Sequence, residues 1–102
     1  MVLYKREALA DLENIRLGLL NWNKIQLTEE FVIAYMFDIK TICDALDKKR
    51  LHHKATYDDH KKFGTYIHSY KRNSSTMWYI VYNVEGDDIF VNKILNNYQT
   101  VS

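Results

Sequence analysis

The N-terminal half of the chain repeats apolar residues every three or four positions, as amphipathic helices do. The first such stretch begins at Arg6 and ends near the run NWN at residues 21–23. The second extends from about Glu29 to Asp47 and follows Thr28, a residue type that favours the N-cap. Its apolar stripe contains Phe31, Tyr35, Ile39, Ile42 and Leu46, widened by Val32, Met36 and Cys43. The short link between the two stretches predicts an antiparallel helical hairpin.

The C-terminal part instead alternates apolar and polar residues, which is typical of β-strands. The runs GTYIHSYKRN, MWYIVYNV and IFVNKIL are separated by the turn-forming runs NSS and EGDD. Residues 2–5 predict a short opening strand, and residues 48–63 predict a long polar loop with room for one helical turn. This order predicts one α+β domain over residues 1–102, a two-helix hairpin packed on a small, mainly antiparallel sheet.

The central strand has two faces of similar apolar character. Trp78, Ile80 and Tyr82 share one face, and Tyr79, Val81 and Asn83 share the other. The alternation alone does not say which face meets the helices.

Composition and charge narrow the classes of protein. No apolar run approaches the roughly 18 residues of a membrane span, and the N-terminus lacks a signal-peptide pattern. The lone Cys43, expected in the core, fits a reducing compartment, so we expect a cytoplasmic protein with no membrane contact. Net charge is +1, but residues 48–72 hold eight Lys/Arg against two Asp/Glu. Such a basic block is typical either of a surface that attracts phosphates or acidic proteins, or of a solvated loop.

The same basic block contains all four histidines of the chain, at positions 52, 53, 60 and 68. Their spacing does not match a pair of ligands on one helix face, and adjacent residues in an extended segment point apart. We therefore expect no metal and no cofactor.

The runs EALADLENI, WYIVYN and IFVNKIL, in this order, resemble the RelE/ParE superfamily of bacterial toxins, also known as plasmid stabilisation proteins. The resemblance extends from about Leu3 to Tyr98 and is carried by fold-forming residues. It implies a toxin of a type II toxin–antitoxin module that a cognate antitoxin neutralises. It also implies that the antitoxin covers an apolar part of the toxin surface, for which we expect the less covered face of the sheet.

Two activities occur among similar proteins. The RelE-like branch cleaves messenger RNA on the ribosome without a metal, and the ParE-like branch binds DNA gyrase. Cleaving members of that family commonly carry an arginine early in the central strand, where this chain has Tyr79. They also carry a His-Tyr pair or a lone Tyr at the end of the last strand, where this chain has Asn97 and Tyr98, so the tyrosine is present without the histidine. A phenol is neutral at pH 7 and does not replace a guanidinium.

If the chain is a ribonuclease, its basic block has to supply the missing charge. The candidate catalytic residues are His68 as base, Tyr98, Arg72 and Lys71. The candidate nucleic-acid-binding residues are Lys54, Lys61, Lys62 and Lys93. This hypothesis requires that they converge on one concave surface. A gyrase-binding protein without catalysis, or a degenerate toxin that binds only its antitoxin, remain the alternatives.

Overall fold

The computed structural model of the chain describes residues 1–21 and 28–97. A five-stranded mixed sheet of order β1-β5-β4-β3-β2 forms the centre of this α+β fold. Its strands are β1 (Val2–Tyr4), β2 (His53–Lys54), β3 (Tyr66–Lys71), β4 (Met77–Glu85) and β5 (Asp88–Asn96). The β2–β3, β3–β4 and β4–β5 pairs are antiparallel, whereas β1 runs parallel to β5. The α+β class predicted from the sequence is thus confirmed.

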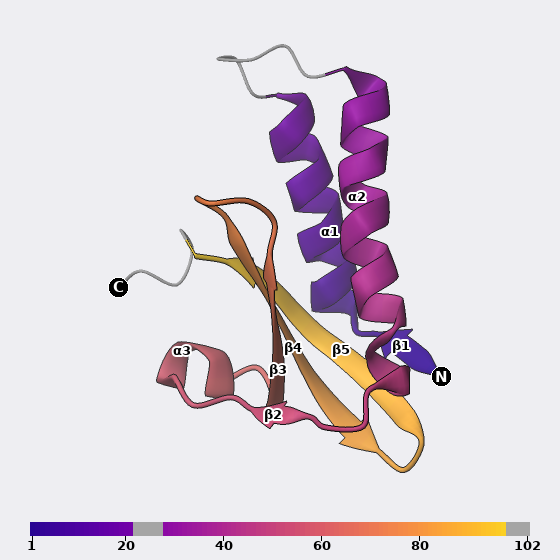
Figure 1. Cartoon of the computed structure of the whole chain (residues 1–102), viewed down its shortest axis with the longest axis vertical. Coiled ribbons are helices and arrows are strands. Elements are labelled where there is room, and N and C mark those ends of the chain that lie inside the picture. Colours follow the sequence, from indigo (N-terminus) through magenta and orange to yellow (C-terminus); the bar gives the residue numbers. More distant parts are fainter. Residues whose placement is uncertain (22–27, 98–102) are drawn as a thin grey trace.

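The long helices α1 (Arg6–Leu20) and α2 (Glu29–Asp44) lie side by side, and both lie on one side of the sheet (Figure 1). Thr28 caps α2 as predicted, because its Oγ1 accepts a hydrogen bond from the Phe31 amide at 3.1 Å. The helix ends three residues before the predicted Asp47, and a 3-10 helix, η1 (Leu46–Lys48), follows it. No helix in the described ranges is long and apolar enough to cross a membrane.

The core lies between these two helices and the sheet. Its buried members come from both helices, from η1 and from the two central strands: Ala8, Tyr35, Ile39, Cys43, Leu46, Trp78, Ile80, Tyr82, Ile89, Val91 and Ile94. Trp78, Ile80 and Tyr82 therefore face the helices. Burial of Cys43 is confirmed and raises the pKa of its thiol to about 12, which suits packing rather than reaction. Phe31 was wrongly placed in the core stripe, since it is 44% exposed.

A β-bulge in β5 changes the alternation of that strand. Val81 pairs with Lys93 and Tyr82 with Val91, so Asn92 is an extra residue between them. Because of the bulge, Ile94 and Val91 both reach the helix-covered face although three positions separate them. Asn92 instead bonds to the carbonyl of Phe63, and Lys93 bonds to the carboxylate of Asp11.

Residues 48–63 contain more structure than the predicted loop. Besides the strand β2 they form a short helix, α3 (Asp58–Lys61), which lies on the side of the sheet away from α1 and α2 (Figure 1). The two residues of β2 pair with Ile67 and Tyr66 of β3. Elements this short leave no periodic pattern, so their pairing could not be found from the sequence.

Candidate nucleic-acid interface on the far face of the sheet

The face of the sheet turned away from α1 and α2, here called the far face, carries Tyr79, Val81 and Asn83 of β4. Residues 55–65 cover part of it. The ring of His60 in α3 lies on Tyr79, with their centroids 4.9 Å apart. The covering segment therefore lies beside Tyr79.

Backbone and amide hydrogen bonds fix this segment to the sheet. The Ala55 amide donates to the Thr65 carbonyl at 2.9 Å, and the Thr65 amide donates to Asn83 Oδ1 at 2.8 Å. The bulge residue Asn92 donates from Nδ2 to the Phe63 carbonyl at 2.9 Å. The sheet thus holds the segment through side chains of both central strands.

Gly64 lies at the closest approach between the segment and the sheet. A Cβ atom there would lie 2.9 Å from Asn92 Nδ2, 3.0 Å from Val81 Cγ1 and 3.1 Å from Asn83 Oδ1. The first separation is shorter than real Cβ contacts, and the other two are tighter than most of them. A larger residue would therefore displace these side chains, two of which hold the segment, or push the segment away from the sheet.

Between this segment and the sheet lies an open pocket of about 540 Å³, here called the lysine pocket. Lys54, Lys61 and Lys62 line it, together with Ala55, Phe63, Gly64, Thr65 and Asn83. All three lysines are exposed. Three of the four residues that the sequence nominates for nucleic-acid binding therefore gather at one place.

The fourth nominated residue, Lys93, is close by but already paired. Its Nζ lies 2.9 Å from Asp11 Oδ1 and 5.4 Å from the centroid of the Phe63 ring. The carboxylate neutralises its charge, so Lys93 contributes less to attraction of phosphates than the three exposed lysines do.

The residues nominated for catalysis do not meet at the lysine pocket. Lys71 lies on the far face but is exposed at the end of β3, whereas His68 pairs with Ile80 and lies on the helix-covered face. Arg72 also turns to the helix side, where its guanidinium lies 4.3 Å from the centroid of the Tyr35 ring and bonds to Asp38. Tyr98 lies outside the described residues. The described members of the set are therefore divided between the two faces of the sheet.

His68 has a partner that limits its use as a base. Lys49 Nζ donates to His68 Nδ1 at 2.8 Å, because an ammonium group can only donate. Burial, and then the charges of Lys49 and His53, lower the pKa of His68. The neutral ring then carries its proton on Nε2 and has no free lone pair to accept another. This arrangement does not favour His68 as a general base, and the assignment stays a prediction.

His60 is the residue of this region that sequence reasoning considered only as a metal ligand. It is 4% exposed, and its Nε2 is buried without a hydrogen-bond partner among the described residues. Burial lowers the pKa of His60, against the opposing charge of Asp59. The packing of His60 on Tyr79 depends on α3, which has no periodic signal, so nothing in the sequence pointed to this contact.

The histidines do not form a metal site in the described part of the chain, where no three His, Cys, Asp or Glu side chains lie close enough to hold an ion. His52 instead contacts the hydroxyl of Tyr82, with Nδ1 2.7 Å from the oxygen. Burial raises the pKa of Tyr82 to about 12, so its hydroxyl keeps its proton within this hydrogen bond.

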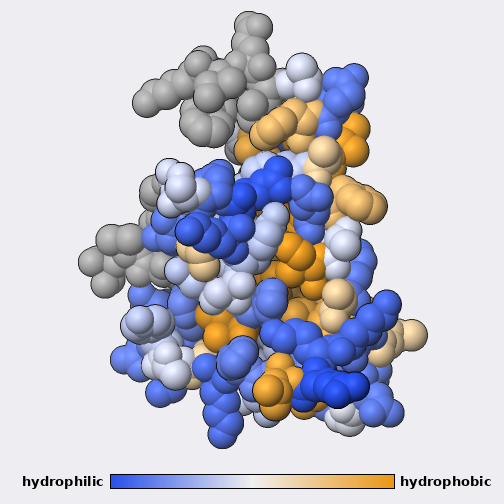
Figure 2. Space-filling view, viewed as in Figure 1, coloured by the Kyte–Doolittle hydropathy of each residue, from blue (hydrophilic) through white to orange (hydrophobic). Residues whose placement is uncertain are grey.

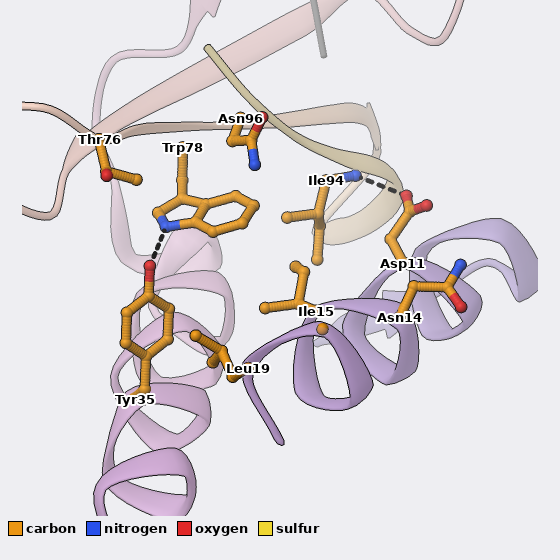
Figure 3. Close-up of a pocket in the computed structure, with 10 residues that line it drawn as sticks. Asp11, Asn14, Ile15, Leu19, Tyr35, Thr76, Trp78, Ile94 and Asn96 are labelled. Atoms are coloured by element: carbon orange, nitrogen blue, oxygen red, sulfur yellow. Dashed lines mark hydrogen bonds between the residues drawn. The ribbon is translucent and has the colours of Figure 1, made fainter. Parts of the chain in front are cut away.

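A second hollow lies on the helix side, between α1, α2 and the ends of β4 and β5 (Figure 3). It has a volume of about 310 Å³, and its wall includes Ile15, Leu19 and Ile94. The Trp78 indole donates to the Tyr35 hydroxyl at 3.0 Å, and the Asp11 carboxylate accepts from the Ile94 amide. Asp11, the charged residue in the lining of this pocket, is thus already hydrogen-bonded, in contrast to the three exposed lysines of the lysine pocket.

Comparison of the chain with protein-family models, with curated proteins and with solved structures found no match. The geometry of the site and the resemblance of the sequence runs therefore carry the functional interpretation.

Buried His60 and half-buried His68 give the stability a defined pH dependence. The pKa values of His60 and His68 are lowered in the folded chain, so below about pH 6.5 the unfolded chain binds more protons. We expect the midpoint temperature of unfolding to decrease as the pH is lowered from about 7 to about 5. The decrease should be smaller in the variant His60→Gln plus His68→Gln. Thermal unfolding followed by circular dichroism measures both, and an equal fall in the two proteins would contradict the assignment.

Proposed function

We propose that this chain is the toxin component of a bacterial type II toxin–antitoxin module, similar to RelE/ParE proteins, and that its far face binds RNA. The fold supports this proposal, because two adjacent helices precede an antiparallel meander, as the resemblance of the sequence runs implies. Under this proposal the protein acts in the cytoplasm, on messenger RNA at the ribosome.

The observation that carries the proposal is the lysine pocket on the same face of the sheet as Tyr79. Exposed lysines in a concave site attract a polyanion and give binding that is steep in salt. Lys54, Lys61 and Lys62 lie around a pocket on the same face as the position where cleaving relatives carry their arginine.

The proposed chemistry is cleavage without a metal. The 2′-oxygen of the RNA loses its proton and bonds to the adjacent phosphorus while the bond from that phosphorus to the 5′-oxygen of the next nucleotide breaks. The products are a 2′,3′-cyclic phosphate and a 5′-hydroxyl, whose oxygen takes up a proton. That reaction needs a group to accept the hydroxyl proton and positive charge to stabilise the crowded phosphate. The lysine pocket can supply the charge.

The antitoxin is the second proposed partner. The sequence placed it on the less covered face of the sheet, but the outer side of α2 also exposes an apolar surface, and we propose this surface instead. Ile33 and Phe37 are one helical turn apart and are 62% and 68% exposed. In Figure 2 apolar residues are visible beside α2 in the middle of the molecule, among hydrophilic ones. Exposed apolar groups of this kind are what a partner helix buries.

Induction of the chain alone in a bacterial host tests the proposal. We expect growth arrest with cleavage of ribosome-bound messages, and we expect co-expression of the cognate antitoxin to restore growth. Primer extension on abundant messages locates the cuts. Growth arrest with intact messages and a DNA-damage response would instead establish the gyrase-binding function, and unchanged growth would identify a chain that retains only antitoxin binding.

A further inference from the structure

A second open pocket adjoins the lysine pocket on the far face. It has a volume of about 500 Å³ and is formed where the start of α1 meets residues 62–63 and the central strands. Lys5, Arg6, Glu7, Lys62, Phe63, Asn83 and Asn92 line it. Lys62, Phe63 and Asn83 line both pockets, so the two lie side by side and share these residues as a common wall.

The cations of this second pocket are available for a ligand. Lys5 and Arg6 are both exposed, and neither forms an ion pair within the described part of the chain. Lys5 Nζ lies 5.8 Å from the centroid of the Phe90 ring on β5, which holds its ammonium group over the sheet. Glu7 is the single acidic residue in the lining.

The shared wall also concentrates positive charge. Lys62 Nζ lies 5.2 Å from the centroid of the Phe63 ring, so this ammonium group stays at the junction of the two pockets. The two pockets together present five cations against one acid. The start of α1 and residues 54–62 lie far apart in the sequence, and the folded sheet brings their charges together.

We propose that the two pockets form one continuous groove for single-stranded RNA, in which Lys5 and Arg6 hold phosphates of the nucleotides next to those at the lysine pocket. This inference rests on the proposed function and extends its site. A flexible single strand can enter two pockets in succession, and a positively charged groove that follows the backbone is the usual way to bind such a strand. Each volume lies in the range of pockets that enclose a small organic molecule, such as one nucleotide.

The test is the salt dependence of binding to a fluorescent single-stranded RNA of roughly ten nucleotides, measured by anisotropy. Each phosphate contact of a single strand contributes about 0.7 to the slope of log K against log salt. The variant Lys5→Gln plus Arg6→Gln is expected to reduce that slope by about 1.4 and the affinity at about 0.1 M salt by about 25-fold. The variant Lys5→Arg plus Arg6→Lys keeps the charge and should retain the wild-type slope.

The charge-matched control is Lys48→Gln plus Arg50→Gln, two exposed cations that line neither pocket. Wild-type slope and affinity in Lys5→Gln plus Arg6→Gln would overturn the groove while leaving RNA binding at the lysine pocket intact. If the control variant loses as much affinity and salt slope as Lys5→Gln plus Arg6→Gln, the loss reflects net charge alone and the groove is overturned. Absence of RNA binding by the wild type would overturn the proposed function as well. Polyglutamate that binds as tightly, with the same loss in the variant, would replace RNA with an acidic protein as the ligand.

Discussion

Replacing Lys54, Lys61 and Lys62 together by glutamine is expected to weaken the binding of single-stranded RNA by about 100-fold at about 0.1 M salt. The three ammonium groups line one pocket and are exposed, so each can release counterions from a phosphate. Three lost contacts should reduce the salt slope by about 2. Fluorescence anisotropy across a series of salt concentrations gives both quantities.

The matched control for this variant removes three cations that lie outside the lysine pocket. Lys40, Lys48 and Arg50 are exposed and do not line it. Their replacement by glutamine should leave the salt slope within experimental error of the wild type. If the control weakens binding as much as the pocket variant does, the lysine pocket is not the RNA site. In the growth assay the pocket variant should also relieve the arrest.

Replacing Asp11 by alanine is expected to lower the free energy of unfolding by about 3 kcal/mol. Asp11 Oδ1 accepts from Lys93 Nζ, and Oδ2 accepts from the Ile94 amide, each at 2.9 Å. The Asp11 and Lys93 side chains are 11% and 21% exposed. Without the carboxylate, the Lys93 ammonium and the Ile94 amide would both remain largely buried without their partner.

The position of Asp11 explains why its loss costs more than that of a surface ion pair. β1 covers the edge of β5 only from Ile89 to Val91, and beyond that point α1 takes its place. The carboxylate of Asp11 therefore provides the acceptor that a continued strand would have given to Ile94. Urea unfolding of Asp11→Ala and of wild type measures the difference.

Glu13→Ala provides the comparison on the same helix. Glu13 pairs with Arg16 on the exposed side of α1, and solvent screens such exposed pairs so that they contribute little to stability. We expect its unfolding midpoint to stay close to that of the wild type. A loss of less than about 1 kcal/mol in Asp11→Ala would show that water replaces the carboxylate at the edge of the sheet.

The periodic parts of the sequence predicted the elements well. The start of α1 at Arg6, the Thr28 cap and the three strands of the meander all appear as expected, with ends that shift by a few residues. These features depend on neighbouring residues, whose spacing records which side of a helix or strand is apolar. The charge count of residues 48–72 likewise identified lysines that the fold gathers into one pocket.

The candidate site was harder to predict, because its parts come from segments without a period. The ribonuclease hypothesis required His68, Lys71 and Arg72 to converge with the lysines on one concave surface, although strand alternation itself puts Lys71 on the face opposite His68. The β3–β4 register turns His68 toward the helices and Lys71 away from them, so these residues do not converge. The contact of His60 with Tyr79 requires α3, and the closeness of Lys5 and Arg6 to Lys62 requires the parallel β1–β5 pair. None of these contacts is between neighbours in the chain.

By itself, the sequence determined the α+β class and the apolar sides of the helices and strands. It also determined that residues 48–72 are basic and that the single cysteine cannot form an internal disulfide. The tertiary structure alone decided which face of β4 meets the helices, since Trp78 and Tyr79 are both aromatic and alternation treats the two faces alike. It also decided which cations are neutralised, as Lys93 is by Asp11, and which remain exposed around the lysine pocket. The physical reason is that a local pattern records the apolar side of each element, whereas strand order, register and the bulge at Asn92 bring distant charges together.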